Sequence, residues 1–485
     1  MKLEKLIQNI KYLNSKGAFD KDVSGIEFDS RKVKPGTAFV AQRGLNVDGH
    51  DFIGKAEEKG ATVIFCERFP VKISEDLTYI TVEDTSRILG ELASAYHNFP
   101  SQQMKVIGIT GTNGKTSIAT LLYRLFMDLG YKTGLISTIN YQINEKSETA
   151  SHTTPDALKI QHLMAEMVIK GCEFCFMEVS SHAVHQQRIQ GIHFFGGIFT
   201  NITHDHLDYH KTFAEYIKAK QRFFDYLPKE AFAITNVDDK NGKVMVQNTK
   251  ARKVTYSSRA MADYRVKVLE RHFDGMLLNL AGNEVWTRFV GNFNASNLLA
   301  VYAAAVELGQ NESEILTQIS NLQPVEGRFE TVRSTDGKLA IVDYAHTPDA
   351  LKNVLNAISE IRTGDEQLIT VIGAGGDRDK TKRPQMTKEA LLESDRVILT
   401  SDNPRTEDPT QIIKDMETGV EPQFSKKVVS IENRREAIKT ATIIAQSGDI
   451  ILVAGKGHET YQEVNGVRHH FDDLEELKKC FGIEE

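Results

Sequence analysis

Short apolar runs alternate with helical stretches through most of this chain, and this alternation limits its fold more than any other feature. The run "MKVIGIT" at 104–110 precedes "SIATLLYRLFMDLG", where one helical face carries Ile118, Leu121, Leu122, Leu125 and Phe126. Four more such runs follow, namely "KTGLIST", "CEFCFMEVS", "GGIFTNI" and "AFAITNV". Brief apolar runs are typical of buried parallel strands, so the pattern predicts a doubly wound α/β sheet.

A second series of strands begins near residue 331, with "KLAIVDYA", "QLITVIGAGG", "RVILTSD" and "DIILVAGKG". Residues 20–85 carry shorter strand-like pieces, and a helical stretch then ends before Pro100, where the residue preceding proline favours an extended backbone. The length of 485 residues allows about three domains. We predict a small N-terminal α/β domain (1–100), a central doubly wound domain (101–330) and a C-terminal Rossmann-like α/β domain (331–485).

Composition excludes several classes of partner. The formal net charge is -7, so neither nucleic acid nor an anionic membrane is expected as a partner. No apolar run is long enough to span a bilayer, and the start of the chain lacks the apolar core of a signal peptide. We therefore expect a cytoplasmic protein. Cys172 and Cys175 form a C-x-x-C, but they lie in a strand-like run without a second pair, which favours core packing over redox or zinc chemistry.

The segment "TGTNGKTS" follows a strand and opens a helix, which is the context of a phosphate-binding loop. Its spacing is shorter than G-x-x-x-x-G-K-[ST], because the position of the first glycine holds Ile109. Gly111 and Gly114 let backbone amides turn toward a phosphate, Lys115 can reach the outer phosphates, and Thr116 can hold Mg²⁺. The loop predicts an ATP- or GTP-dependent enzyme with a P-loop-type ATPase domain at its centre.

Two further clusters of polar residues belong to the central domain. In "FMEVSSHAVHQQR", Glu178 ends a strand as a second candidate metal ligand, although a satisfied strand end with a solvated turn is the plainer alternative. In "HDHLDYH", imidazoles and carboxylates crowd one predicted loop, in a spacing that favours Mg²⁺ over zinc. These cluster residues are Ser180, His182, Gln186, Arg188, His204, Asp205, His206, Asp208 and His210. Lys220 lies on the next helix, where a lysine taken alone is expected to be solvated.

Four strand ends of the C-terminal domain carry charged side chains. They predict a clamp for a zwitterion, in which arginines bind carboxylates and Glu459 or Asp402 binds an ammonium. The residues are Asp343, His346, Arg378, Lys380, Lys382, Arg383, Asp402, Arg405, Lys456, His458 and Glu459.

The motifs "TGTNGKTS", "EVSSH", "HDHLDYH" and "VDYAHTPDA" together resemble the Mur ligases, the ATP-dependent amino-acid-adding enzymes of peptidoglycan synthesis, whose phosphate loop has this shorter spacing. The resemblance runs from about residue 25 to 465. "FDSRKVKPGTAFVA", "HTTPDA", "SDNPRTEDP" and "AGKGHET" are similar to the branch that joins a diamino acid to UDP-N-acetylmuramoyl-L-alanyl-D-glutamate through an acyl phosphate. We therefore expect a cell-wall ligase that acts as a monomer.

The resemblance also implies roles for single residues. For ATP it implies Gly111, Thr112, Asn113, Gly114, Lys115, Thr116, Ser117, Asn297, Arg328 and Asp343, and for Mg²⁺ it implies Thr116, Glu178 and His206. Lys220 matches a lysine that is carbamylated in the family, so that its added carboxylate helps to organise Mg²⁺; Lys115, Lys220 and His206 are the implied catalytic residues. For the UDP-substrate the resemblance implies Ser30, Thr153, Thr154, Ser180, Gln186 and Arg188, and for the incoming amino acid Arg378, Asp402, Asn403, Pro404, Arg405, Gly455 and Glu459.

The form "DNPR" resembles the enzymes that add meso-diaminopimelate. Diaminopimelate carries a second carboxylate that a guanidinium such as Arg405 can grip with two hydrogen bonds, and L-lysine lacks that carboxylate. The alternatives are the same ligase adding L-lysine, and the pentapeptide-forming or folylpolyglutamate ligases. A rival of another class is a nucleotide-gated binding protein that hydrolyses ATP without ligation.

Overall fold

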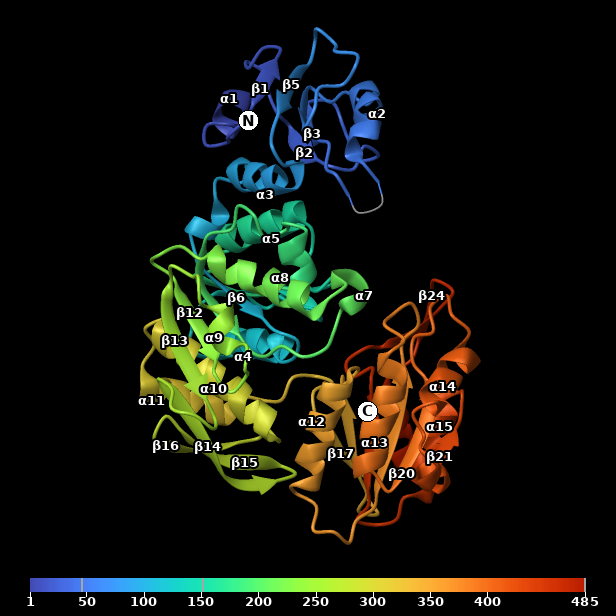
Figure 1. The fold of residues 1–485 in the computed structure, drawn as a ribbon. Coiled ribbons are helices and arrows are strands. Elements are labelled where there is room, and N and C mark those ends of the chain that lie inside the picture. The colour runs from blue at the N-terminus through green and yellow to red at the C-terminus, as the bar shows by residue number, and fades with distance from the viewer. Residues whose placement is uncertain (45–46, 151, 484–485) are drawn as a thin grey trace.

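Three separate β-sheets define three domains in this structure, a computed structural model that describes residues 1–44, 47–150 and 152–483. Figure 1 shows the domains in sequence order, with the N-terminal domain at the top and the C-terminal domain at the lower right. The first sheet ends at Thr81, the second spans 105–287 and the third spans 330–454. The predicted α/β class is therefore confirmed, and we propose that the domain boundaries lie between the sheets, near residues 100 and 330.

The N-terminal domain is a five-stranded sheet of order β1-β5-β4-β3-β2, in which only β1 runs antiparallel to its neighbour. Its strands β3 and β4 are buried along their whole length, as their apolar residues require. The strands are β1 (Asn14–Lys16), β2 (Gly25–Glu27), β3 (Thr37–Val40), β4 (Val63–Cys66) and β5 (Thr78–Thr81), and the helices are α1 (Leu3–Leu6), η1 (Gly49–Phe52), α2 (Ile53–Glu58) and α3 (Thr85–Tyr96).

The link after α3 differs from the sequence prediction. Phe99, which precedes Pro100, is left-handed (φ 54°) instead of extended. The amide of Phe99 donates to the carbonyl of Ser94 at 2.7 Å, and its ring packs against the N-terminal core. This bond ends the helix in a tight turn, and the turn outweighs the usual preference before proline.

The central domain has an eleven-stranded sheet of order β16-β15-β14-β13-β12-β11-β6-β10-β7-β8-β9. Its middle, from β14 to β7, is parallel as predicted, with the apolar face of α4 packed against it. The strands are β6 (Lys105–Thr110), β7 (Thr133–Ile136), β8 (Asn140–Ile143), β9 (Lys146–Thr149), β10 (Phe174–Glu178), β11 (Phe194–Phe199), β12 (Phe232–Asn236), β13 (Arg252–Ser257), β14 (Tyr264–His272), β15 (Gly275–Leu280) and β16 (Asn283–Thr287). The helices are η2 (Pro100–Gln102), α4 (Lys115–Asp128), α5 (Ala157–Ile169), α6 (Ser181–His185), α7 (Leu207–His210), α8 (Phe213–Asp225), α9 (Gly242–Met245), α10 (Asn292–Glu307) and α11 (Glu312–Asn321).

Both edges of the central sheet are antiparallel, which the sequence reading did not predict. β8 and β9 extend one edge and β15 and β16 the other. Cys172 and Cys175 are buried free thiols, as expected for core packing.

The C-terminal domain is a six-stranded sheet of order β17-β18-β22-β19-β20-β21, parallel except for β17, beside a separate hairpin of β23 and β24. The strands are β17 (Glu330–Arg333), β18 (Leu339–Asp343), β19 (Leu368–Ala374), β20 (Arg396–Ser401), β21 (Val428–Ser430), β22 (Ile450–Ala454), β23 (Tyr461–Val464) and β24 (Val467–His470). The helices are α12 (Pro348–Ser359), α13 (Lys382–Glu393), α14 (Pro409–Glu417), η3 (Pro422–Lys427), α15 (Arg434–Ile444) and α16 (Asp473–Phe481). Within the described residues, no helix is long and apolar enough to cross a membrane.

Candidate active site

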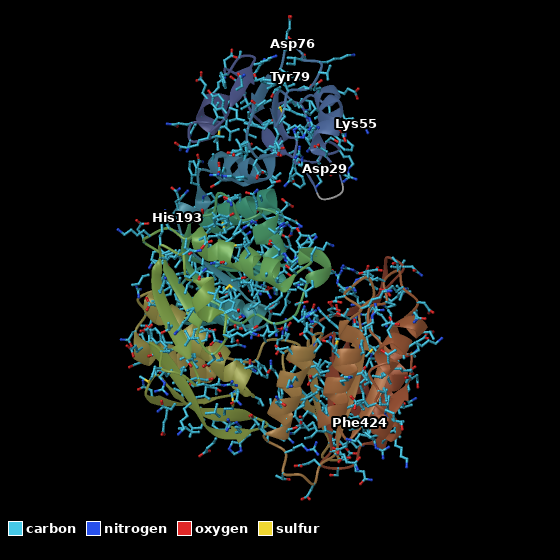
Figure 2. All side chains as sticks on the ribbon, viewed as in Figure 1. Asp29, Lys55, Asp76, Tyr79, His193 and Phe424 are labelled. Carbon is cyan, nitrogen blue, oxygen red and sulfur yellow. The ribbon has the colours of Figure 1, made fainter. Side chains whose placement is uncertain are left out.

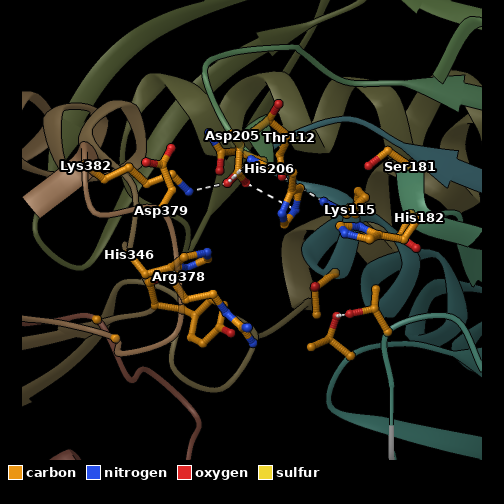
Figure 3. Close-up of a pocket in the computed structure, with 18 of the residues that line it drawn as sticks. Thr112, Lys115, Ser181, His182, Asp205, His206, His346, Arg378, Asp379 and Lys382 are labelled. Carbon is orange, nitrogen blue, oxygen red and sulfur yellow. Dashed lines mark hydrogen bonds and ion pairs between the residues drawn. The ribbon is translucent and has the colours of Figure 1, made fainter. Parts of the chain in front are cut away.

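A cavity of about 470 Å³ lies where strand ends of the central and C-terminal domains meet. Figure 3 shows side chains of both domains reaching into it. Many of the predicted site residues line it, namely Thr112, Asn113, Gly114, Lys115, Thr116, Thr153, Thr154, Glu178, Ser180, Arg188, His206, Lys220, Arg328, Arg378, Asp402, Asn403, Arg405, Gly455 and Glu459. Residues far apart in the sequence thus share one cavity.

The phosphate loop joins β6 to α4. Gly114 is left-handed (φ 87°), and a Cβ on it would lie 2.7 Å from Oδ1 of Asn297, so the turn requires glycine there. Lys115 folds back on the loop, where its Nζ donates to the carbonyls of Gly111 at 3.0 Å and Thr112 at 2.7 Å. Burial lowers the pKa of Lys115, because the buried ammonium loses its hydration, and the charge of Glu178 partly offsets this effect.

Lys220 is buried, which contradicts the expectation of a solvated helical lysine. Its Nζ donates to the carbonyl of Gly111 at 2.7 Å and lies 4.8 Å from the centre of the Tyr216 ring. Burial, with the charge of Lys115 as a smaller cause, holds the pKa of Lys220 well below its usual value. A lysine with a lowered pKa is more often neutral at pH 7, and the neutral amine is the form that can react with CO₂.

Glu178 is a fully buried carboxylate with one free oxygen. Its Oε1 accepts from the amide of Thr138 at 2.7 Å, while Oε2 has no hydrogen-bond partner among the described residues. A buried carboxylate oxygen without a partner is costly unless a cation reaches it. Mg²⁺ favours such oxygen ligands, so Glu178 and the nearby hydroxyl of Thr116 fit that ion. No group of three or more His, Cys, Asp or Glu side chains in the described ranges could hold a metal alone.

The neighbours of Glu178 form the wall beside it. Thr154 donates from Oγ1 to the carbonyl of Glu178 at 2.8 Å, and Arg188 donates from Nη1 to the carbonyl of Thr154 at 2.8 Å. Gln186 does not line the cavity, and its Oε1 accepts from Nε of Arg188 at 3.0 Å. Gln186 thus fixes the guanidinium that faces the cavity.

The "HDHLDYH" segment is only partly a loop, because its last four residues form α7. His210 does not line the cavity, and its Nε2 lies 2.9 Å from Oγ of Ser181, which does. His204 lies 3.5 Å from the Asp379 carboxylate. Asp205 forms an ion pair with Lys382 across the two domains, which Figure 3 shows beside His206. The five side chains predicted to crowd one loop are therefore divided, because Asp205, His206 and Asp208 line the cavity and His204 and His210 do not. Their service of a divalent ion stays a prediction.

Arg328 and Tyr344 line another side of the cavity and contact one another. The Arg328 guanidinium stacks on the Tyr344 ring at 4.5 Å, and its Nε has no partner among the described residues. Asp343 and Asn297 lie behind the wall instead of lining it. Burial raises the pKa of Asp343 to about 6, against the lowering effect of Arg328, and its Oδ2 accepts from the amide of Phe329 at 2.7 Å.

The "DNPR" segment follows β20, and its Asp402, Asn403 and Arg405 line the side of the cavity that the C-terminal domain provides. Asn403 donates from Nδ2 to Oε2 of Glu459 at 2.7 Å, and buried Lys456 lies 3.2 Å from the same Glu459 oxygen. Arg405 donates from Nη1 to the carbonyl of Gly376 at 2.8 Å. The carboxylates of Asp402 and Glu459 and the guanidinium of Arg405 therefore share this wall, as a zwitterionic ligand requires.

Three cations of the predicted clamp have protein partners instead. The Arg383 guanidinium is buried and bonded to Glu407 at 2.9 Å and Asp415 at 2.8 Å. Lys380 pairs with Glu407 at 3.1 Å, and Lys382 with Asp205. Among the basic residues after the glycine turn, Arg378 has no acidic partner in the described parts of the chain. Its guanidinium donates to the carbonyl of Asp377.

Ser30 lies in the N-terminal domain and does not line the cavity. It is buried beside Asp29, which Figure 2 shows on the side of that domain facing the rest of the chain. Gly111, Ser117 and Pro404 also stay behind the cavity surface, although each adjoins a lining residue.

Comparison with known proteins agrees with this architecture. Family models described as "Mur ligase family, catalytic domain", "Mur ligase middle domain" and "Mur ligase, glutamate ligase domain" match residues 22–97, 109–305 and 327–457. A curated relative from Phocaeicola vulgatus, UDP-N-acetylmuramoyl-L-alanyl-D-glutamate--2,6-diaminopimelate ligase, is 55% identical and covers 100% of both chains. The chain belongs to the Mur ligase family.

Solved structures of Mur ligases share the fold. A structure of a UDP-N-acetylmuramoyl-L-alanyl-D-glutamate--2,6-diaminopimelate ligase is 34% identical, covers 99% of both chains and has a TM-score of 0.72. The MurF ligase from Thermotoga maritima, solved in complex with ADP, is 19% identical, covers 94% of this chain and 96% of that one, and has a TM-score of 0.65, which shows a shared fold.

Several lining residues of this Mur ligase were not singled out from the sequence. Thr138 lies in no motif that points to chemistry, and Asp379 looked like one more charge in a polar turn. Tyr344 follows Asp343 at a strand end, and that position was a usable signal.

Proposed function

We propose that this Mur ligase joins meso-diaminopimelate to the γ-carboxyl group of the D-glutamate in UDP-N-acetylmuramoyl-L-alanyl-D-glutamate, with hydrolysis of ATP, in peptidoglycan synthesis. The observation that carries this proposal is that one cavity is lined both by the phosphate loop, which includes Lys115, and by the charged side chains of Asp402, Arg405 and Glu459. We assign the reaction to the cytoplasm and to a monomer.

The reaction begins with attack of the γ-carboxylate on the γ-phosphorus of ATP, which forms an acyl phosphate and releases ADP. Lys115 neutralises the charge that develops on the transferred phosphoryl group. Gly114 offers its backbone amide at the start of α4, where the helix dipole favours phosphate. Asn113 belongs to the same loop, and its own amide donates to Oδ1 of Asn201 at 2.9 Å. Thr112, Thr116, Ser117, Asn297, Arg328 and Asp343 complete the proposed ATP site.

The amine of the diamino acid then attacks the acyl carbon, so that the amide bond forms, phosphate leaves and the amine loses a proton to solvent. Glu459 and Asp402 hold the ammonium group of the distal amino-acid centre, while Arg405 and Arg378 bind carboxylates. Asn403, Pro404 and Gly455 shape this site. Closure of the domains over the cavity excludes water, which would otherwise hydrolyse the acyl phosphate.

Residues of the central domain hold the first substrate and the metal. Thr153, Thr154, Ser180, Gln186 and Arg188 bind the muramoyl dipeptide, and Ser30 binds the uridine end. Thr116, Glu178, His206 and a carbamylated Lys220 would hold Mg²⁺, which supplies charge neutralisation on the phosphates when bound. The partnerless oxygen of Glu178 and the lowered pKa of Lys220 support this assignment.

The test is release of phosphate by the purified chain with Mg·ATP and UDP-N-acetylmuramoyl-L-alanyl-D-glutamate. Separate reactions contain meso-diaminopimelate, L-lysine or no amino acid. Release only with meso-diaminopimelate is expected, and Lys115→Ala abolishes it, while Lys243→Ala on the exposed face of α9 serves as the control. Release only with L-lysine contradicts the substrate assignment, and release without any amino acid favours a plain ATPase.

A further inference from the structure

The hairpin of β23 and β24 stands outside the main sheets of the protein. Among the described residues, its strands pair with one another and make one further bridge, between Val464 and Arg405. Asn465 and Gly466 are both left-handed and form the two-residue turn that suits a hairpin. Figure 1 draws β24 at the upper tip of the C-terminal domain. β23 is half-buried, whereas β24 is exposed along its whole length, so packing in a core does not explain the hairpin.

The backbone of the hairpin holds Arg405 on both sides. The amide of Arg405 donates to the carbonyl of Glu463 at 3.0 Å, and its carbonyl accepts from the amide of Asn465 at 2.7 Å. Arg405 is left-handed (φ 52°), a conformation that residues with a Cβ adopt only where the surroundings impose it. The two hydrogen bonds impose it, and they set the direction in which the side chain leaves the backbone.

Side-chain hydrogen bonds lock the hairpin to the residues before Arg405. Gln462 donates from Nε2 to the carbonyl of Asp402 at 2.7 Å. The amide of Glu463 donates to Oδ1 of Asn403 at 2.9 Å. Asn403 also donates to Glu459, so one network joins the hairpin, the "DNPR" turn and the cavity wall. Of the hairpin side chains, Gln462 makes the short direct contact with that turn.

We propose that the hairpin is a specificity element and that Gln462 is a positioning residue for the far carboxylate of the diamino acid, acting through Arg405. This inference rests on the proposed function, because it assumes that Arg405 binds that carboxylate. Gln462 fixes the carbonyl of Asp402 three residues before Arg405, while the hairpin backbone fixes Arg405 itself. Without the Gln462 bond the turn can rotate, and the guanidinium loses its preset direction.

A double-mutant cycle tests the inference by calorimetric binding of meso-diaminopimelate to the full chain with a non-hydrolysable ATP analogue. Gln462→Ala is expected to raise the Kd about tenfold, as loss of a well-placed hydrogen bond does. In an Arg405→Ala background the same change is expected to add less than about twofold, because its effect runs through Arg405. Gln462→Glu keeps the shape but loses the donor, so it should behave like Gln462→Ala.

The control is Gln423→Ala, whose amide bonds only to exposed Glu421 at 2.8 Å in the described chain. It should leave the Kd unchanged, and thermal unfolding should show that all variants stay folded. An unchanged Kd in both Gln462 variants overturns the inference, and so does an equal loss with and without Arg405. Wild-type protein that binds meso-diaminopimelate but forms no product contradicts the proposed function, while the cycle still decides the role of Gln462. Wild-type protein that does not bind it overturns both.

Discussion

Asn113 in the phosphate loop donates a hydrogen bond from its Nδ2 to Oδ2 of Asp349, over 2.9 Å. Asp349 lies in the first turn of α12 in the C-terminal domain, so this bond joins the two domains at the proposed ATP site. The same carboxylate accepts from Oγ1 of Thr203 at 3.4 Å, on the segment that leads to His206. The C-terminal domain, which carries the proposed amino-acid site, thus contacts the proposed phosphate loop.

Replacing Asp349 should therefore weaken ATP binding from a distance. We expect Asp349→Ala to raise the KM for ATP about tenfold or more, because it removes a hydrogen bond to a charged acceptor. Steady-state kinetics with saturating amino acid measure it. Asp336→Ala, at an exposed carboxylate of the same domain, should leave the KM unchanged. A normal KM for ATP in Asp349→Ala would show that the contact has no part in nucleotide binding.

Lys220 should react with CO₂. Burial lowers its pKa, and the neutral amine is the form that gains the carboxylate. Protein incubated with ¹³C-bicarbonate should show a carbamate carbon by NMR, and exhaustive removal of CO₂ should lower activity in a way that bicarbonate restores. Lys220→Arg should show neither the signal nor the recovery, because its guanidinium stays protonated. A carbamate signal that persists in Lys220→Arg would assign the modification to another residue.

Arg434 and Asp473 form a fully buried ion pair between α15 and α16, with bonds of 2.6 and 2.7 Å. Removing one partner leaves the other charge buried and unpaired. Asp473→Ala should lower the free energy of unfolding of the C-terminal domain by about 3–5 kcal/mol, measured by urea denaturation. Asp22→Ala removes the exposed pair with Lys2 and should leave the urea midpoint in place. Equal midpoints for both variants would contradict a structural role for the buried pair.

His458 should make stability depend on pH. Burial, and then the charge of Arg328, lowers its pKa to about 3, from 6.5 in the unfolded chain. Between these values the unfolded chain binds the proton more readily, so this contribution to stability falls as pH drops below 6.5, by up to about 1.4 kcal/mol per pH unit, and levels off below about 3. His458→Phe keeps a ring beside Tyr344, 5.0 Å away, and should flatten the dependence in urea denaturation at pH 7 and pH 5. If the wild type and His458→Phe lose the same stability between pH 7 and pH 5, the pH dependence comes from other groups.

The sequence predicted the parallel middles of the sheets because fully buried strands leave continuous apolar runs, as at 106–109 and 450–454. It missed the edge strands β8, β9 and β16, whose polar and partly or fully exposed residues carry no such signal. It also missed β15, although that strand is largely apolar and mostly buried. The burial of a single side chain such as Lys220 could not be predicted, because Lys220 is bonded to Gly111, which is 109 residues away in the sequence. Arg383 looked like a ligand until the structure placed Glu407 and Asp415 against it. Pairing of charges across a fold cannot be read from local spacing.

Mass spectrometry of the reaction products tests most directly the claim that this ligase adds meso-diaminopimelate through an acyl phosphate. The reaction contains Mg·ATP, equal amounts of meso-diaminopimelate and L-lysine, and UDP-N-acetylmuramoyl-L-alanyl-D-glutamate labelled with ¹⁸O in the γ-carboxylate. The account predicts a product that carries diaminopimelate and keeps one labelled oxygen, with the other labelled oxygen in the released phosphate. A lysine product would contradict the role given to Arg405, and unlabelled phosphate would contradict the acyl phosphate.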